Sequence, residues 1–152
     1  ELLAAGVSVA IGADGAPCNN RLDGFTELRL ASLLQKGRCG PCALPAAQAL
    51  ELATLGGARA LGLQAEIGSL TMGKRADITV VELNRPHVLP VHSPLSAVVY
   101  AAQGSDVRHV LVDGELLVHD GELTARTGLD LGRLRALASE RVPVLMRRAG
   151  LA

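Results

Sequence analysis

The pattern of apolar and polar positions divides the chain into two halves with different periodicities. Residues 7–11 form a short apolar run, which is typical of a strand buried on both faces of a parallel sheet. Apolar residues then recur at helical spacing from Leu22 to Gln35, and Pro45 precedes the strong helix formers of Ala46 to Leu55. We therefore predict a strand followed by two helices.

Punctuating residues predict where these helices begin and end. Asn20, followed by Asp23, predicts a side-chain cap at the start of the first helix. Lys36-Gly37 predicts its end, because a cation in the last turn and a glycine just after it are typical of a helix C-terminus. Gly56-Gly57 predicts the end of the second helix, and residues 58–63 add a short helical turn.

After about Gln64 the pattern changes to that of antiparallel strands. It predicts a strand over Ile78 to Leu83 and a hairpin of residues 107–112 and 115–119 around Asp113-Gly114, a pair that favours a type I′ turn. Pro86, Pro90 and Pro94 predict a loop of extended segments between them. A last helix is expected over Leu131 to Arg141, capped by Asp130 and ended or kinked by Pro143.

The predicted fold class is therefore mixed, α/β in the first half and β in the second. A single βα unit cannot form a parallel sheet, because such a sheet needs neighbouring strands and cover on both faces. The chain also begins at Glu1 rather than Met. Both observations lead us to expect a piece of a longer protein.

Composition narrows the classes of partner. The 152 residues carry 15 basic and 15 acidic side chains, with no block of like charge and one Phe and one Tyr as the aromatic residues. We therefore expect no nucleic-acid partner and no membrane-surface binding. The apolar runs are far shorter than the roughly 20 residues that a membrane span needs, and no secretory signal opens the chain. We expect a cytoplasmic protein.

Asp14 is the first candidate for chemistry. It follows the apolar run 7–11, and the carboxyl ends of such strands are where parallel α/β enzymes place their reactive groups. A buried carboxylate costs several kcal/mol unless a metal, a proton or hydrogen bonds compensate. The alternative interpretation is that Asp14 is a turn residue before a helix.

The sequence around Asp14 resembles a known enzyme superfamily. Gly12-Ala-Asp14-Gly-Ala-Pro-Cys-Asn-Asn20, continuing through Lys36, resembles the final barrel strand and helix of the amidohydrolases. The resemblance is greatest to the branch of cytosine-deaminase-like proteins, adenosylhomocysteine and methylthioadenosine deaminases, and chlorotriazine hydrolases. This chain departs from the usual pattern at Ala13 and Cys18. The resemblance continues through residues 43–45, 53–62, 67–77 and 99–114.

The resemblance implies an architecture. Residues 1–64 would supply the last strand and helices of an incomplete (β/α)8 barrel. Residues 65–124 would supply part of the small β-sandwich domain that accompanies the barrel, and residues 125–152 would form a C-terminal helix that packs back.

The resemblance also implies a function for the complete enzyme. It would be hydrolytic deamination, or dechlorination, of a small aminated N-heterocycle or nucleoside. Asp14 would bind one divalent metal, zinc or iron, and also accept and return a proton. Asn19 is a possible substrate-binding residue, and we expect a homo-oligomer.

The metal-binding histidines of the superfamily are not present in this sequence. Relatives place a His-x-His pair on the first barrel strand and single histidines on two middle strands. The four histidines here are His87, His92, His109 and His119, and no two of them form that pair. Because a zinc or iron site needs about three or four protein ligands, we expect the isolated chain to be inactive.

Two other classes of function remain open. Cys39-Gly-Pro-Cys42 resembles the thioredoxin redox motif, but a predicted helix end precedes it where thioredoxin has a strand. With Cys18 the cysteine count is odd, so a disulfide framework is not expected. The other alternative is a non-catalytic module that associates with a partner or with itself.

Overall fold

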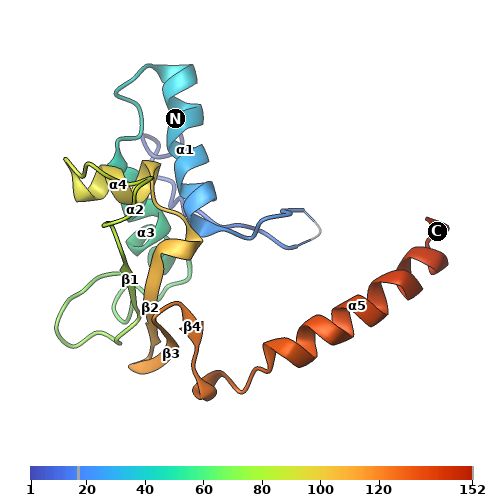
Figure 1. The fold of residues 1–152 in the computed structure, drawn as a ribbon. Coiled ribbons are helices and arrows are strands. Elements are labelled where there is room, and N and C mark those ends of the chain that lie inside the picture. Colours follow the sequence, from blue (N-terminus) through green and yellow to red (C-terminus); the bar gives the residue numbers. More distant parts are fainter. Residues whose placement is uncertain (17, 152) are drawn as a thin grey trace.

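The computed structural model describes residues 1–16 and 18–151, and these form a helical layer, a small sheet and a projecting helix (Figure 1). The helical layer consists of α1 (Gly24–Cys39), α2 (Ala46–Ala53), α3 (Leu55–Ala60) and α4 (Pro94–Tyr100). Its core contains the buried side chains of Leu28, Ala49 and Val99, one each from α1, α2 and α4. Segments distant in sequence therefore share one core.

The sheet is an antiparallel meander in the order β1 (Ile78–Val81), β2 (Val107–Val112), β3 (Glu115–His119) and β4 (Glu122–Leu123). The predicted hairpin is confirmed with the same strand limits. Asp113 (φ 51°) and Gly114 (φ 80°) both have left-handed backbone, as a type I′ turn requires. The predicted strand from Ile78 is confirmed but ends at Val81, two residues early.

Residues 7–11 do not form the predicted strand in this structure. These residues belong to no strand, and Val7 is 48% exposed. The N–H of Ile11 donates to the carbonyl of Leu52 in α2, at 3.3 Å. A parallel strand needs a neighbouring strand to receive its N–H and C=O groups, and residues 7–11 have none beside them. The extended segment therefore lies against helices instead.

The first cap was also misassigned. Asp23, not Asn20, is the N-cap of α1, because its side chain accepts a hydrogen bond from the N–H of Phe25 at 3.0 Å. The helix continues through Gly37 and ends at Cys39, with Gly40 as its C-cap.

Gly56 and Gly57 lie inside α3 rather than at a helix end, so this predicted end is wrong as well. The break between α2 and α3 falls at Thr54, whose side chain donates to the carbonyl of Leu50. A Cβ at position 56 would come within 2.9 Å of the carbonyl oxygen of Val9. Gly56 thus serves close packing between α3 and the extended segment 7–11.

The proline-rich stretch contains a helix that the sequence analysis missed. Ser93 caps α4 by accepting from the N–H of Ser96, and Pro94 occupies the first helical turn, where its missing N–H has no cost. Short 3-10 turns, η1 (Gly104–Asp106) and η2 (Ala125–Thr127), flank the sheet.

The last helix, α5 (Leu131–Arg148), is capped by Asp130 as predicted, but it continues through Pro143. It extends away from the rest of the molecule (Figure 1). None of the helices within the described ranges combines the length and the apolar character needed to cross a bilayer.

Candidate functional site

Asp14 lies in the loop between the extended segment 7–11 and α1, and this loop projects from the helical layer (Figure 1). Its side chain is exposed, and Oδ1 accepts a hydrogen bond from the N–H of Gly15 at 2.8 Å. The backbone of Asp14 is left-handed, with φ 58°, a conformation that Asp adopts more readily than most residues. No cationic side chain among the described residues forms an ion pair with Asp14. The carboxylate is therefore free to meet a group from outside this chain.

Asn19 anchors the base of the same loop. Its Oδ1 accepts from the N–H groups of Arg21 and Leu22, at 3.0 and 3.2 Å, and its Nδ2 donates to Oε1 of Glu27 in α1, at 2.6 Å. Both ends of the amide are thus engaged within the chain. The arrangement orients the loop relative to α1, and a substrate contact by Asn19 stays a prediction.

Metal binding needs more donors than this site holds. Among residues 1–16 and 18–151, no group of three or more His, Cys, Asp or Glu side chains is arranged to hold a metal ion. A carboxylate oxygen is a suitable zinc ligand, but a protein zinc site uses about three or four ligands. The carboxylate of Asp14 is chemically suited to be one such ligand, and the described residues place no set of further donors around it.

The structure brings two of the four histidines together. The rings of His109 and His119 lie on adjacent strands, with centroids 5.0 Å apart, beside Asp120. The Asp120 carboxylate already accepts from the guanidinium of Arg108 at 2.8 Å. The negative charge of Asp120 is therefore already paired with a cation of this chain.

His87 belongs to a polar cluster that sequence reasoning did not find. Its Nε2 lies 2.8 Å from Oδ2 of Asp106, a carboxylate that is only 1% exposed. The same oxygen accepts from the backbone N–H of Gln103 at 3.0 Å, in a capping box around η1. The spacing of Gln103 and Asp106 could have revealed the capping box, but not the contact of Asp106 with His87. The cluster ties the loop before α4 to the start of β2.

Cys39 and Cys42 are both exposed free thiols, and α1 leads directly into Cys39. The loop between them is held by Lys36, whose Nζ donates to the carbonyls of Pro41 and Ala43 at 2.9 and 3.0 Å. Thioredoxin-type chemistry uses the N-terminal end of a helix, whereas Cys39 lies at a C-terminal end. The geometry does not favour the redox alternative.

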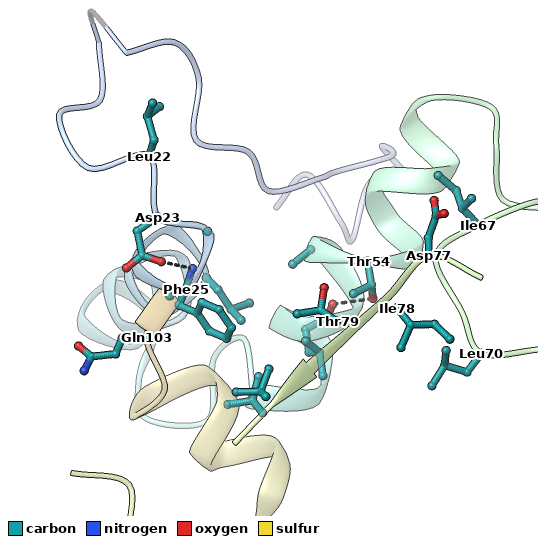
Figure 2. Close-up of a pocket in the computed structure, with 18 of the residues that line it drawn as sticks. Leu22, Asp23, Phe25, Thr54, Ile67, Leu70, Asp77, Ile78, Thr79 and Gln103 are labelled. Carbon is teal, nitrogen blue, oxygen red and sulfur yellow. Dashed lines mark hydrogen bonds between the residues drawn. The ribbon is translucent and has the colours of Figure 1, made fainter. Parts of the chain in front are cut away.

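A groove of about 1200 Å³ separates the N-terminal end of α1 from β1 (Figure 2). Apolar side chains such as Phe25, Ile67 and Ile78 line it. Its two carboxylates have structural partners, since Asp23 caps α1 and Asp77 accepts from the N–H of Asp113 at 2.7 Å. Asp14 does not line this groove, so we do not assign it to the chemistry of Asp14.

Comparison with known proteins identifies the family. The amidohydrolase family model matches residues 1–117, which include Asp14, Asn19 and β2. The chain belongs to the amidohydrolase family. The resemblance seen in the sequence motifs is thereby confirmed.

Two of the proteins that this amidohydrolase chain resembles are named as deaminases. It is 50% identical over 143 residues to a 5-methylthioadenosine/S-adenosylhomocysteine deaminase from Moorella thermoacetica. This match covers 93% of the chain and 33% of the relative. An adenosine deaminase structure from Xanthomonas campestris with bound zinc is 41% identical, with a TM-score of 0.86, over 91% of this chain and 31% of the other. The chain thus spans about a third of the length of these relatives.

A second solved structure matches almost the whole chain. It is an amidohydrolase from an environmental sample of the Sargasso Sea, 31% identical with a TM-score of 0.81, and the match covers 97% of this chain and 33% of that chain.

Proposed function

We propose that this chain is the C-terminal part of a hydrolytic deaminase that removes the amino group of an adenine nucleoside derivative. The 50% identity to a methylthioadenosine and adenosylhomocysteine deaminase is the observation that carries the proposal. The zinc in the related adenosine deaminase structure supports a divalent metal in the complete enzyme, and we propose zinc rather than iron on that ground.

Asp14 is the residue of this chain that we place in the reaction. Its carboxylate is exposed, and the bond from the N–H of Gly15 holds Oδ1 in place while leaving Oδ2 available. A carboxylate in this setting can accept a proton from the attacking water and return it to the departing amine nitrogen. A divalent metal, when bound, would polarise the reacting groups and take Asp14 as one of its ligands.

The supporting contacts around Asp14 come from the loop and from α1. Asn19 fixes the base of the loop through Glu27, which places Asp14 at the end of the extended segment 7–11. We propose that residues 7–11 become a barrel strand when the remaining two-thirds of the enzyme supply neighbouring strands. On this view the separated chain is inactive because its other metal ligands lie outside it.

The family match does not favour the two alternatives. A thiol redox domain would not account for an amidohydrolase match over residues 1–117. A purely associative module would not account for 50% identity to a deaminase over 93% of this chain. Deamination is preferred to dechlorination because the Moorella and Xanthomonas relatives are both deaminases.

The test uses a hybrid, defined as the full-length Moorella relative with its matching third replaced by this chain. Zinc-loaded hybrid should release ammonia from 5-methylthioadenosine, and the 152-residue chain alone should not. Asp14→Asn should lower kcat of the hybrid by about 10²- to 10⁴-fold, because it removes a proton acceptor. A chlorinated triazine in place of the nucleoside tests the dechlorination alternative.

Asp113→Asn is the matched control. Asp113 is also an exposed aspartate with left-handed backbone (φ 51°), but it lies in the hairpin turn. The substitution Asp113→Asn should leave kcat of the hybrid nearly unchanged. A well-folded, zinc-loaded hybrid that keeps full activity with Asn at position 14 would remove Asp14 from the reaction.

A further inference from the structure

Three hydrogen bonds connect the carboxylate of Asp14 to a side chain of α1. The N–H of Gly15 donates to Oδ1 of Asp14 at 2.8 Å. The carbonyl of Gly15 in turn accepts from the N–H of Asn19 at 2.9 Å. Nδ2 of Asn19 donates to Oε1 of Glu27 at 2.6 Å. The position of Asp14 is therefore linked to the carboxylate of Glu27 through the residues between them.

The planar amide of Asn19 has one orientation that satisfies all of its neighbours. Its Oδ1 faces the backbone N–H groups of Arg21 and Leu22, at 3.0 and 3.2 Å, and these can only donate. Its Nδ2 faces the carboxylate of Glu27, and an ionised carboxylate can only accept. Exchanging the oxygen and the nitrogen would place donor against donor at one end and acceptor against acceptor at the other. Glu27 therefore determines which way the amide of Asn19 points.

Glu27 is well placed to hold this amide. It lies in the first turn of α1, where the helix dipole favours a negative charge. Within residues 1–16 and 18–151 it takes part in no ion pair, so no cation draws its carboxylate away from Asn19. A carboxylate also forms a stronger hydrogen bond than a neutral acceptor does. The contact is partly buried, which protects it from competition by water.

The loop that carries Asp14 requires such an anchor because its backbone is left-handed at two residues. Asp14 has φ 58° and Leu22, just before the cap of α1, has φ 49°. Leucine seldom adopts this conformation, because its Cβ then lies too close to the following carbonyl oxygen. The hydrogen bond from the N–H of Leu22 to Oδ1 of Asn19 offsets this strain. Without Glu27 the amide of Asn19 can rotate, and the loop loses the contact that holds its geometry.

We infer that Glu27 is a positioning residue for Asp14 and acts through the amide of Asn19. This inference rests on the proposed function, in which Asp14 accepts and returns a proton. Proton transfer depends on the distance between the carboxylate and the atoms that exchange the proton. A loosened loop should therefore slow the reaction step more than it weakens substrate binding.

The first measurement is amide hydrogen exchange of the loop, made on the 152-residue chain and on the hybrid. Glu27→Ala should speed exchange at the N–H groups of Asn19, Arg21 and Leu22 by about tenfold, because the loop opens more often. Glu27→Gln should change it by less than about twofold, since the glutamine oxygen can also accept from Nδ2 of Asn19. Exchange does not depend on turnover, so it tests the link to Glu27 directly.

Thr26→Ala is the matched control for the same helical turn. The hydroxyl of Thr26 donates to Oδ2 of Asp23 at 2.9 Å, so its removal also breaks a side-chain hydrogen bond at the start of α1. That bond does not involve Asn19. Thr26→Ala should leave both the exchange of the loop amides and kcat nearly unchanged.

The second measurement is the kinetics of the zinc-loaded hybrid. Glu27→Ala should lower kcat about 10- to 100-fold and change KM by less than about threefold. Glu27→Gln should restore kcat to within about threefold of the original. Asn19→Ala should match the loss of Glu27→Ala, and the double variant should lose no more than either single variant, because both side chains act through one contact.

Several outcomes would overturn the inference. Unchanged kcat in Glu27→Ala would do so, whether or not the loop exchanges faster, because Glu27 would then not set the position of Asp14. Equal losses in Glu27→Ala and Thr26→Ala would indicate general damage to α1. Additive losses in the double variant would indicate that Asn19 and Glu27 act independently. If Glu27→Ala does not fold, Glu27→Asp gives the same test, since it keeps the charge but withdraws the carboxylate by one methylene.

Failure of this inference is distinguishable from failure of the proposed function. A folded, zinc-loaded hybrid with Glu27 intact that releases no ammonia contradicts the proposed function. The loop exchange of Glu27→Ala then decides the inference, since faster exchange supports the link from Glu27 to the loop and unchanged exchange overturns it. A hybrid that deaminates equally well with alanine at position 27 contradicts the inference and leaves the proposed function standing.

Discussion

Two segments that the sequence predicts to be strands have different fates in this chain. Residues 107–112 form β2 and pair with β1 and β3, whereas residues 7–11 form no strand at all. The partner of β2 follows it after a two-residue turn, Asp113-Gly114. The segment 7–11 would need a parallel neighbour, which can only come from a distant part of a sequence. Strand formation here depends on the presence of a partner more than on the strand sequence.

Supplying the missing partner should have the largest effect. In the hybrid, the amides of residues 7–11 should exchange at least about 1000-fold more slowly than in the isolated chain, because strand pairing suppresses local opening. Exchange in 107–112 should change little, since β2 is already paired on both sides. Mass spectrometry of the two peptides measures both. Equal protection of 7–11 in the isolated chain and the hybrid would contradict our explanation of the comparison.

A substitution that strains the turn between β2 and β3 should have an intermediate effect. Gly114→Val should lower the free energy of unfolding by about 1–2 kcal/mol, because a β-branched residue is strained at a φ of 80°. Gly114→Asn is the control and should cost less, since Asn tolerates left-handed backbone. Urea unfolding of both variants tests this. Similar losses for Val and Asn would show that the turn does not determine the pairing.

The smallest effect concerns the cap between the two regions. Asp23→Ala should lower stability by about 1 kcal/mol, because the N–H of Phe25 loses its acceptor. Asn20→Ala should change stability much less, since Asn20 is exposed and does not cap α1. Urea unfolding monitored by circular dichroism compares the two. If Asn20→Ala lowers stability more than Asp23→Ala does, then Asn20 caps α1, as the sequence predicted.

The sequence predictions were mostly correct for features that depend on neighbouring residues and less accurate for features that depend on distant ones. The hairpin limits, the Asp130 cap and the start of β1 were predicted correctly, because each depends on neighbouring residues. The missed helix α4 has local signals, Ser93 and Pro94, that were interpreted only as proline breaks. The ends at Gly56-Gly57 and at Pro143 were misplaced because packing against Val9, and the continuity of α5, outweigh local propensity.

The candidate site divides in the same way. The motif around Asp14 could be recognised from sequence, and the family match confirms the resemblance on which it rests. The bonds of Asn19 to Glu27, and of His87 to Asp106 19 positions later, could not be predicted. They join side chains whose proximity depends on how α1, α4 and η1 pack.

The sequence by itself determined the family, the hairpin and the identity of Asp14 as the candidate reactive group, because motifs and turns are encoded by consecutive residues. Only the tertiary structure decided that residues 7–11 remain extended without strand partners and that Asp14 is exposed. It alone showed that α5 presents an uncovered apolar face. The physical reason is that burial and strand pairing require atoms from elsewhere in the protein, and their presence or absence is not written in the local pattern.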